Sequence, residues 1–210
     1  MRSTQQVVSD FRRNEIVDAA RTVFARRGFA GGIIDEIARE AGIAKGTVYL
    51  YFRSKTEIYK AVLDRDMESL TRGTVEAIDR APSLKDKIAA YTLVRLENAE
   101  AKKEFFRIMD GETSALSIPG KQYRHWLREP VTRLAAAIEE AAQNGLIRPV
   151  PAEKVAWMIV DLTRASIQQR LSGKDDALAR EEAEFLSSFI WAALSIEGPA
   201  QGQGDGRCST

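Results

Sequence analysis

The sequence predicts an all-α protein, in which a three-helix head of helix-turn-helix layout precedes a larger helical body, with about nine helices in total. Apolar residues recur at helical spacing along nearly the whole chain, and runs that alternate apolar and polar residues are too short to indicate a sheet. Glycine, proline and capping residues divide this pattern into segments. With 210 residues, of which 44% are apolar, the chain is long enough for one or two domains with a buried core.

The head begins with a helix over about residues 11–27, and Gly28 follows two arginines as a helix-ending glycine. One stripe of this helix is apolar, with arginines on the opposite side: Phe11, Ile16, Ala20, Val23 and Phe24. A Gly31-Gly32 loop then leads to two short helices, which flank the three-residue turn 42–44. A helix, a glycine-containing turn and a second short helix are the layout of a helix-turn-helix motif.

The longer helices that follow are expected at about 55–80, 84–101, 103–115, 121–143, 152–171 and 177–196. Ser54 and Glu57 form a predicted capping box at the start of the first, and Ser83 with Asp86 caps the second. Pro130 is expected to kink the helix that contains it or to delay its start.

These elements predict three regions of the chain. A helix-turn-helix domain occupies residues 1–54, and a helical domain occupies residues 55–197. Residues 198–210 are rich in glycine and almost without apolar side chains, so this tail is expected to be disordered.

Composition excludes several classes of protein. The single cysteine, Cys208, and the single histidine, His125, rule out an internal disulfide and a Cys- or multi-His metal site, although not a carboxylate site. We expect no metal and no cofactor. No apolar run approaches the roughly 18–20 residues that span a bilayer, and the start has no apolar signal segment, so we expect a cytoplasmic protein with no membrane partner. The glycine-rich phosphate loop and the common nucleophile and zinc motifs are absent, so no enzyme is predicted.

The overall net charge of +1 conceals an asymmetry. Residues 1–60 contain 11 Lys/Arg and 7 Asp/Glu, a net charge of +4, whereas the remainder carries a net charge of −3. A basic head on an acidic body favours a polyanionic partner for the head alone.

The second short helix of the motif has the features of a nucleic-acid contact surface. Its outer face is predicted to carry Lys45, Thr47, Tyr49, Leu50 and Tyr51. A short helix of this kind fits a major groove about 12 Å wide. Gly46 allows a close approach, and Lys55 lies at the next helix start, where phosphate is favoured. An ordinary three-helix core with a tyrosine-rich surface has the same spacing, so spacing alone leaves both interpretations open.

Residues 28–29 (GF) and 35–55 (DEIAREAGIAKGTVYLYFRSK) resemble the DNA-binding head of TetR-family transcriptional regulators. The resemblance covers roughly residues 12–60, and the rest of the chain matches only in its helical architecture. It implies a homodimeric, ligand-responsive regulator of double-stranded DNA, usually a repressor, whose body binds the effector and dimerises. By matching positions, the recognition helix contains the residues from Lys45 to Tyr51, and Tyr51 and Lys55 face phosphates.

Two positions depart from the family pattern. The family usually has Thr or Ser near positions 32 and 33, where this chain has Gly32 and Ile33, and often Ser at position 44, where it has Ala44. Each change removes a hydroxyl cap, which is worth about 0.5–2 kcal/mol against alanine. A phosphate contact from the side chains at 32 and 33 is therefore not expected, although backbone amides could still serve.

Two helices of the body, residues 152–171 and 185–196, are apolar on almost every side. Such helices must be covered all round, which a second copy of the chain would do in a four-helix interface. The predicted interface residues are Val155, Ile159, Leu162, Phe189, Ile190 and Ala193. The alternative is a pair of ordinary core helices.

Aromatic and sulfur-containing residues of the body predict a pocket for a small apolar or aromatic effector. The candidate lining residues are Tyr91, Phe106, Met109, Trp126 and Trp157. Taken singly, each is more often a core residue. Asp161 and Arg164 lie in an apolar stretch, where they contact an effector, each other or a partner chain.

A second function remains open from the sequence. A helical adaptor could bind another protein through the apolar C-terminal helices, although this would leave the 45–55 pattern without a role.

Overall fold

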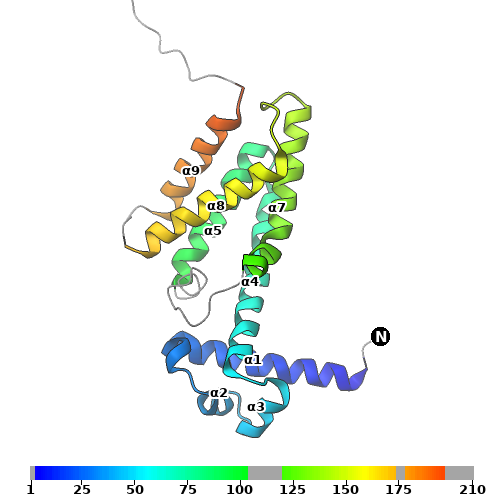
Figure 1. Cartoon of the computed structure of the whole chain (residues 1–210), viewed down its shortest axis with the longest axis vertical. Coiled ribbons are helices and arrows are strands. Elements are labelled where there is room, and N and C mark those ends of the chain that lie inside the picture. The colour runs from blue at the N-terminus through cyan, green and yellow to red at the C-terminus, as the bar shows by residue number, and fades with distance from the viewer. Residues whose placement is uncertain (1–2, 104–119, 174–177, 197–210) are drawn as a thin grey trace, which may run out of the picture. The chain divides into compact units, whose positions relative to one another are not determined.

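The computed structural model describes residues 3–103, 120–173 and 178–196. Within these ranges the chain forms helices and no strand, apart from an isolated antiparallel bridge between Ile147 and Ser195 (Figure 1). The helices are α1 (Thr4–Gly31), α2 (Ile34–Glu40), α3 (Lys45–Tyr51), α4 (Lys55–Arg80), α5 (Leu84–Ala101), α7 (Gly120–Gln143), α8 (Ala152–Leu171) and α9 (Ala179–Leu194). The all-α prediction is confirmed. Most of the predicted helix 103–115 and the whole predicted tail 198–210 lie outside the described residues.

The chain divides into two compact units, residues 1–70 and 71–210. We call the first unit the head and the second the body. The division falls inside α4, so this helix contributes residues to both units, whereas the sequence placed a boundary at its start, after residue 54.

Helix α1 is longer than the sequence stripe indicated. It begins at Thr4, because the Ser3 hydroxyl accepts from the Gln6 amide and the Gln6 side chain accepts from the Ser3 amide. Within the predicted apolar stripe, Ile16 and Ala20 are fully buried, whereas Phe11 is 61% exposed. Phe11 lies on the N-terminal extension of α1, where Val7 and Val8 are also exposed.

The glycine and serine signals fix most helix ends. Gly28 has a φ of +66°, a conformation that side chains disfavour, and it breaks the regular geometry of α1. The Ser54 hydroxyl accepts from the Glu57 amide at 3.2 Å, as predicted. The Glu57 carboxylate accepts from the amide of Arg53 at 2.8 Å, one residue before the predicted Ser54.

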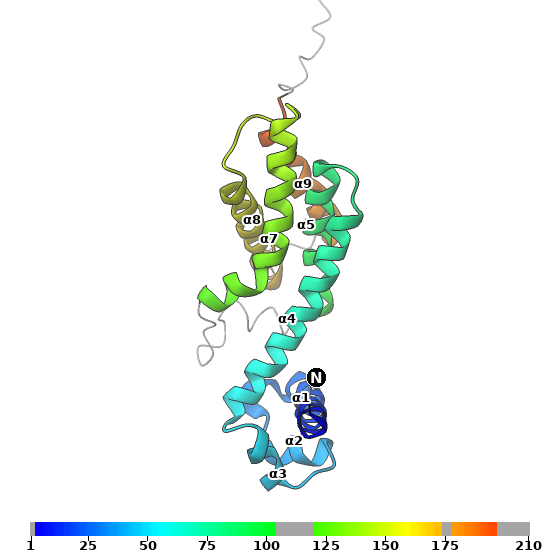
Figure 2. The ribbon, with the colours of Figure 1, turned by 90° about the vertical axis from the view of Figure 1, so that its right-hand side faces the viewer.

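In the body, α5 packs against α7, α8 and α9, and α7 packs against α8 (Figures 1 and 2). Ser83 caps α5 by accepting from the Asp86 amide, as predicted. Pro130 lies inside α7 and does not delay its start, and Figure 2 shows the first turns of α7 bent relative to the rest. Among the described residues, no helix combines the length and the hydropathy that crossing a membrane requires.

Candidate nucleic-acid interface and ligand site

The core of the head fixes the positions of α2 and α3. Ile37 from α2 and Val48 from α3 are fully buried, and Phe52 after α3 is 1% exposed. The ring of Tyr59 from α4 packs edge-on against Phe24, with 4.9 Å between ring centroids. Tyr59 was missed from the sequence, although an aromatic residue one turn from a helix start is an ordinary core signal. These contacts hold the two short helices as one motif.

The predicted contact residues of α3 lie together on its surface. Leu50 is 81% exposed and Tyr49 is 49% exposed. Lys45 and Gly46 are also exposed, whereas Thr47 and Tyr51 are half-buried. The outer face of α3 thus presents aliphatic, aromatic and hydroxyl groups, which suit the mixed polar and methyl surface of a DNA groove.

An ion pair within the motif holds Lys45. Its ammonium lies 3.0 Å from a carboxylate oxygen of Asp35 on α2, and both side chains are about half exposed. The hydrogen bond and the charge of Asp35 raise the pKa of Lys45 above its ordinary value. A lysine whose pKa is raised on folding stabilises the folded state fully at pH values below the ordinary lysine pKa. The stabilisation from the Lys45–Asp35 pair is therefore present at neutral pH and is lost only in alkaline solution. Lys45 is therefore a cation whose charge is partly neutralised before any ligand arrives.

Asp35→Asn is expected to increase affinity for duplex DNA at low salt. Removing the carboxylate frees Lys45 and removes a repulsion toward phosphate, so log affinity should fall more steeply with log salt, by up to about one unit per subunit. The measurement is a salt titration of DNA binding. Glu76→Gln, which breaks the Glu76–Arg80 pair in the body part of α4, is the control and should leave the slope unchanged. An unchanged slope in Asp35→Asn would mean that Lys45 does not meet phosphate.

Lys55 also has partners within the head. Its ammonium donates to the backbone carbonyls of Phe29, at 2.9 Å, and Ala30, at 3.3 Å. It also lies 4.5 Å from the centre of the Phe29 ring. These contacts bind the start of α4 to the end of α1, and the predicted contact of Lys55 with phosphate stays a prediction.

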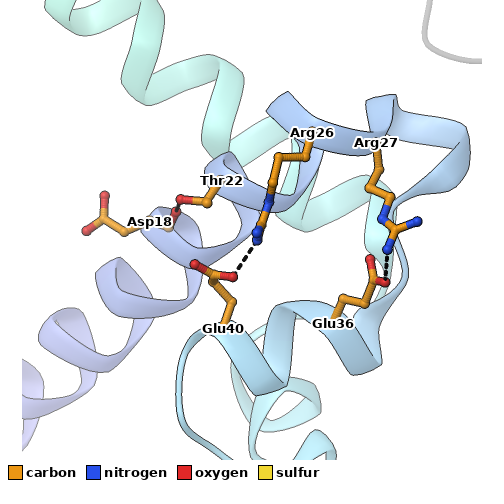
Figure 3. Close-up of polar contacts among 6 residues, drawn as sticks. All are labelled: Asp18, Thr22, Arg26, Arg27, Glu36 and Glu40. Atoms are coloured by element: carbon orange, nitrogen blue, oxygen red, sulfur yellow. Dashed lines mark hydrogen bonds and ion pairs between the residues drawn. The ribbon is translucent and has the colours of Figure 1, made fainter.

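Two further ion pairs join α1 to α2, as Figure 3 shows. Arg26 contacts Glu40 at 2.5 Å, and Arg27 contacts Glu36 at 2.9 Å. Exposed pairs of this kind contribute about 0–1 kcal/mol each, so they orient α2 more than they stabilise the head.

Exposed cations near α3 were not singled out from the sequence. Arg53 directly follows Phe52 and Lys60 lies one turn into α4, and both side chains are exposed. Within the described part of the chain, neither forms an ion pair among those found. The signal for Arg53 was its place between the recognition helix and Ser54, where a cation lies beside a helix start.

Both departures from the family pattern are visible in the structure. Ile33 precedes α2 and Ala44 precedes α3, and neither helix has a side-chain cap. Gly32 is buried, and a β-carbon at that position would come within 2.8 Å of the Phe24 ring. A bulkier residue at position 32 would therefore collide with the core of the head.

The predicted pocket residues of the body do not line one described cavity. Trp157 lines a cleft of about 1020 Å³ between α7 and α8, together with Arg124, His125, Arg128 and the apolar side chains of α7. The Arg124 guanidinium lies 4.7 Å from the Trp157 ring centre. Tyr91 is fully buried on α5, and Trp126 is half-buried, with its backbone carbonyl accepting from Thr71. Phe106 and Met109 lie outside the described residues.

The predicted interface residues fall into two groups. Leu162, Phe189 and Ala193 are exposed, and Val155 is half-buried. Ile159 and Ile190 are 1% and 5% exposed because they pack inside the body, so their side chains are not available on its surface. The exposed large apolar side chains of α8, α9 and the residue after them are Met158, Leu162, Phe185, Phe189 and Ile196.

Comparison with known proteins matches the head to one family. The model described as "Bacterial regulatory proteins, tetR family" matches residues 16–62. This range runs from the buried part of α1 through α2 and α3 into α4. It includes all seven predicted DNA-contact residues.

Relatives extend the similarity along the chain. The HTH-type transcriptional repressor KstR2 of Mycolicibacterium smegmatis is 26% identical over 197 residues, covering 92% of this chain and 93% of that protein. The HTH-type transcriptional activator FasR of the same species is 32% identical over 100 residues, covering 48% of this chain and 46% of FasR. FadR of Bacillus subtilis, solved in complex with stearoyl-CoA, shares the fold with a TM-score of 0.69 and 20% identity, covering 84% of this chain and 96% of that one.

Proposed function

Since this chain belongs to the TetR family of transcriptional regulators, we propose that it acts as a homodimeric repressor released from its operator by a small effector. The operator is a pseudo-palindromic duplex, and the effector is an apolar or aromatic molecule bound by the body. The outer face of α3 carries this proposal, because Tyr49 and Leu50 are exposed on a short helix that the head core holds rigidly.

The DNA contact divides into readout and positioning. Thr47, Tyr49 and Leu50 on α3 read base edges, with Gly46 allowing close approach. Lys45, Tyr51 and Lys55 position the helix by meeting phosphates, as the family pattern implies. Phosphate contacts supply affinity without sequence preference, whereas base contacts supply the preference.

The exposed apolar face of α8 and α9 supports dimerisation. Phe185 and Phe189 stack on each other, with 6.4 Å between ring centroids, and both are more than half exposed. Leu162 and Met158 on α8 are also exposed. A contiguous apolar surface of this kind marks an interface, and a second copy of the same two helices covers it with two-fold symmetry.

The names of the relatives support an apolar effector. FadR was solved in complex with stearoyl-CoA, and the solved KstR2 of Mycobacterium tuberculosis is called a ketosteroid transcriptional regulator. The protein has one arrangement that binds DNA and one that does not. The effector releases DNA because its affinity is higher for the arrangement that does not bind DNA. Helix α4 contains residues of both units, so it is the segment through which the signal passes.

Catalysis is not part of the proposed function, because the family consists of transcriptional regulators. The rival adaptor function uses the same exposed α8–α9 face to bind another protein. Only the regulator needs α3, so a substitution on α3 that abolishes function separates the two.

Selection of bound sequences from random duplex DNA tests the proposal. The enriched site should be a pseudo-palindrome whose half-site centres are about one helical turn apart or more. A Tyr49→Ala chain, changed only on α3, should fail to enrich the same site. Screening small apolar molecules should then find one that releases the selected duplex. An asymmetric half-site bound by a monomer would contradict the proposal.

A further inference from the structure

The Tyr91 hydroxyl is a buried polar group without a hydrogen-bond partner in the described part of the chain. The side chain of Tyr91 is fully buried in α5, and its hydroxyl forms no hydrogen bond with any described residue. A buried hydroxyl without a partner costs free energy, and native proteins keep such groups rarely. The neighbouring polar group differs, because the Thr92 hydroxyl donates within α5 to the Ile88 and Ala89 carbonyls. The Tyr91 hydroxyl is therefore able to form a hydrogen bond with a bound ligand.

Charged and aromatic groups act on the Tyr91 side chain. Arg95 follows one turn later on α5, on the same side of the helix, and is 3% exposed. From α8, the Arg164 guanidinium lies 5.1 Å from the ring centre of Tyr123 on α7. Burial raises the pKa of Tyr91 well above its ordinary value; Arg95 opposes this shift, while Tyr123 and Asp161 add to it. The Tyr91 hydroxyl thus stays protonated at neutral pH and is able to donate a hydrogen bond to a ligand.

The α7–α8 cleft shares helix α8 with Asp161 and Arg164. Trp157, Asp161 and Arg164 occupy successive turns on one face of α8. Trp157 lines the cleft of about 1020 Å³, whereas the charge of Asp161 acts on Tyr91 and Arg164 lies over the ring of Tyr123. The size of the cleft is near the upper end for small-molecule sites, and Val131, Ala135 and Ala136 give it an apolar wall.

We propose that the effector is an apolar molecule with a carboxylate, and that the Tyr91 hydroxyl and the Arg95 guanidinium receive this carboxylate. This inference rests on the proposed function, since it names the chemical class of the molecule that releases the DNA. The guanidinium has several donors, so Arg95 can keep its present contacts and still donate to a ligand. A carboxylate accepts charge-assisted hydrogen bonds from both groups. Arg95 acts on Tyr91 and Arg164 lies over the ring of its neighbour Tyr123, whereas Asp161 is, within the described residues, the one carboxylate that acts on Tyr91, which favours an anion over a cation.

The test compares ligand binding by the full wild-type chain and by the full-length Tyr91→Phe variant. The probes are straight-chain acids of eight to sixteen carbons, together with the methyl ester and the primary alcohol of each. Tryptophan fluorescence measures their binding. The wild-type chain should bind at least one acid about 10-fold more tightly than its ester and alcohol. In Tyr91→Phe this preference should fall about 10-fold, while ester affinity stays unchanged. Tyr59→Phe, the same change at a buried tyrosine of the head, is the control and should keep the preference.

Two further measurements separate a ligand role from a structural one. Without ligand, Tyr91→Phe should melt at the same temperature as the wild type or higher, because no hydrogen bond is lost. A lower melting temperature with an unchanged acid preference would overturn the proposal. Arg95→Lys, which keeps the charge but not the planar donor pair, should weaken acid binding selectively.

The rim of the cleft offers a competing place for the carboxylate. Arg124 and Arg128 are exposed there, so loss of acid preference in Arg128→Gln but not in Tyr91→Phe would overturn the proposal. If no acid in the series binds better than its ester, the carboxylate class is wrong as well. Neither result touches the proposed function, which fails instead if no palindromic duplex is selected or no molecule releases it.

Discussion

Replacing Phe189 with aspartate is expected to convert the proposed dimer to a monomer and to lower operator affinity by at least about 100-fold. Phe189 is 58% exposed in the single chain and stacks on Phe185. A charge buried at an apolar interface without a partner is strongly unfavourable. A monomer can engage only one half-site, so it loses the gain of roughly 100- to 10,000-fold that linked binding sites provide.

Sedimentation and DNA-binding titrations measure these two effects on the same samples. Phe11→Asp provides a matched control, because Phe11 is an equally exposed phenylalanine on the N-terminal extension of α1 in the head. It should leave the dimer intact. If Phe189→Asp remained dimeric with full operator affinity, the second copy would have to dock elsewhere on the molecule.

Phe52→Ala is expected to remove about 3–5 kcal/mol of stability from the head. The ring of Phe52 is 1% exposed, and the Arg13 guanidinium lies 4.2 Å from its centre. Arg13 also donates to the Tyr51 carbonyl at 3.1 Å, so one arginine of α1 fixes the end of the recognition helix. Losing the ring leaves a cavity and releases this support, and operator binding should be lost.

Hydrogen exchange, resolved by peptide, measures the result separately in residues 3–70 and in the body. Amides of the head should exchange faster in Phe52→Ala, while effector binding by the body persists. Leu50→Ala, at a position that is 81% exposed, should change stability by less than about 0.5 kcal/mol and still alter base preference. Slow exchange in the Phe52→Ala head would contradict the role of this ring.

The sequence was sufficient for helices with clear end signals. The predicted bounds 55–80, 84–101 and 152–171 agree with the structure, because serine caps and prolines mark their ends. The start of α1 was missed because Val7 and Val8, which precede the predicted stripe, are exposed apolar residues. An apolar stripe shows which face of a helix is apolar. It does not show how far along the helix the neighbouring elements pack against that face.

The candidate sites were predictable to different degrees. The α3 surface could be read from the sequence, because a short helix with one buried face leaves its other residues outside. The residues of the proposed dimer interface were harder to predict. Helices α8 and α9 are apolar on two sides, and the spacing of apolar residues does not show which side faces the body. Ile159 and Ile190 belong to that inner side. The aromatic residues of the body gave no pocket geometry, because composition does not distinguish the buried Tyr91 from the cleft residue Trp157.

The close approach of Gly32 to Phe24 limits how this head can vary among related proteins. Position 32 lies one residue before Ile33, the N-cap of α2, and the β-carbon of a threonine there would meet the Phe24 ring at 2.8 Å. The two positions are therefore expected to change together: any residue with a side chain at 32 requires a smaller side chain at 24 or a different path for the loop. A head transplanted from a relative is compatible with this scaffold only if both members of the pair are transferred.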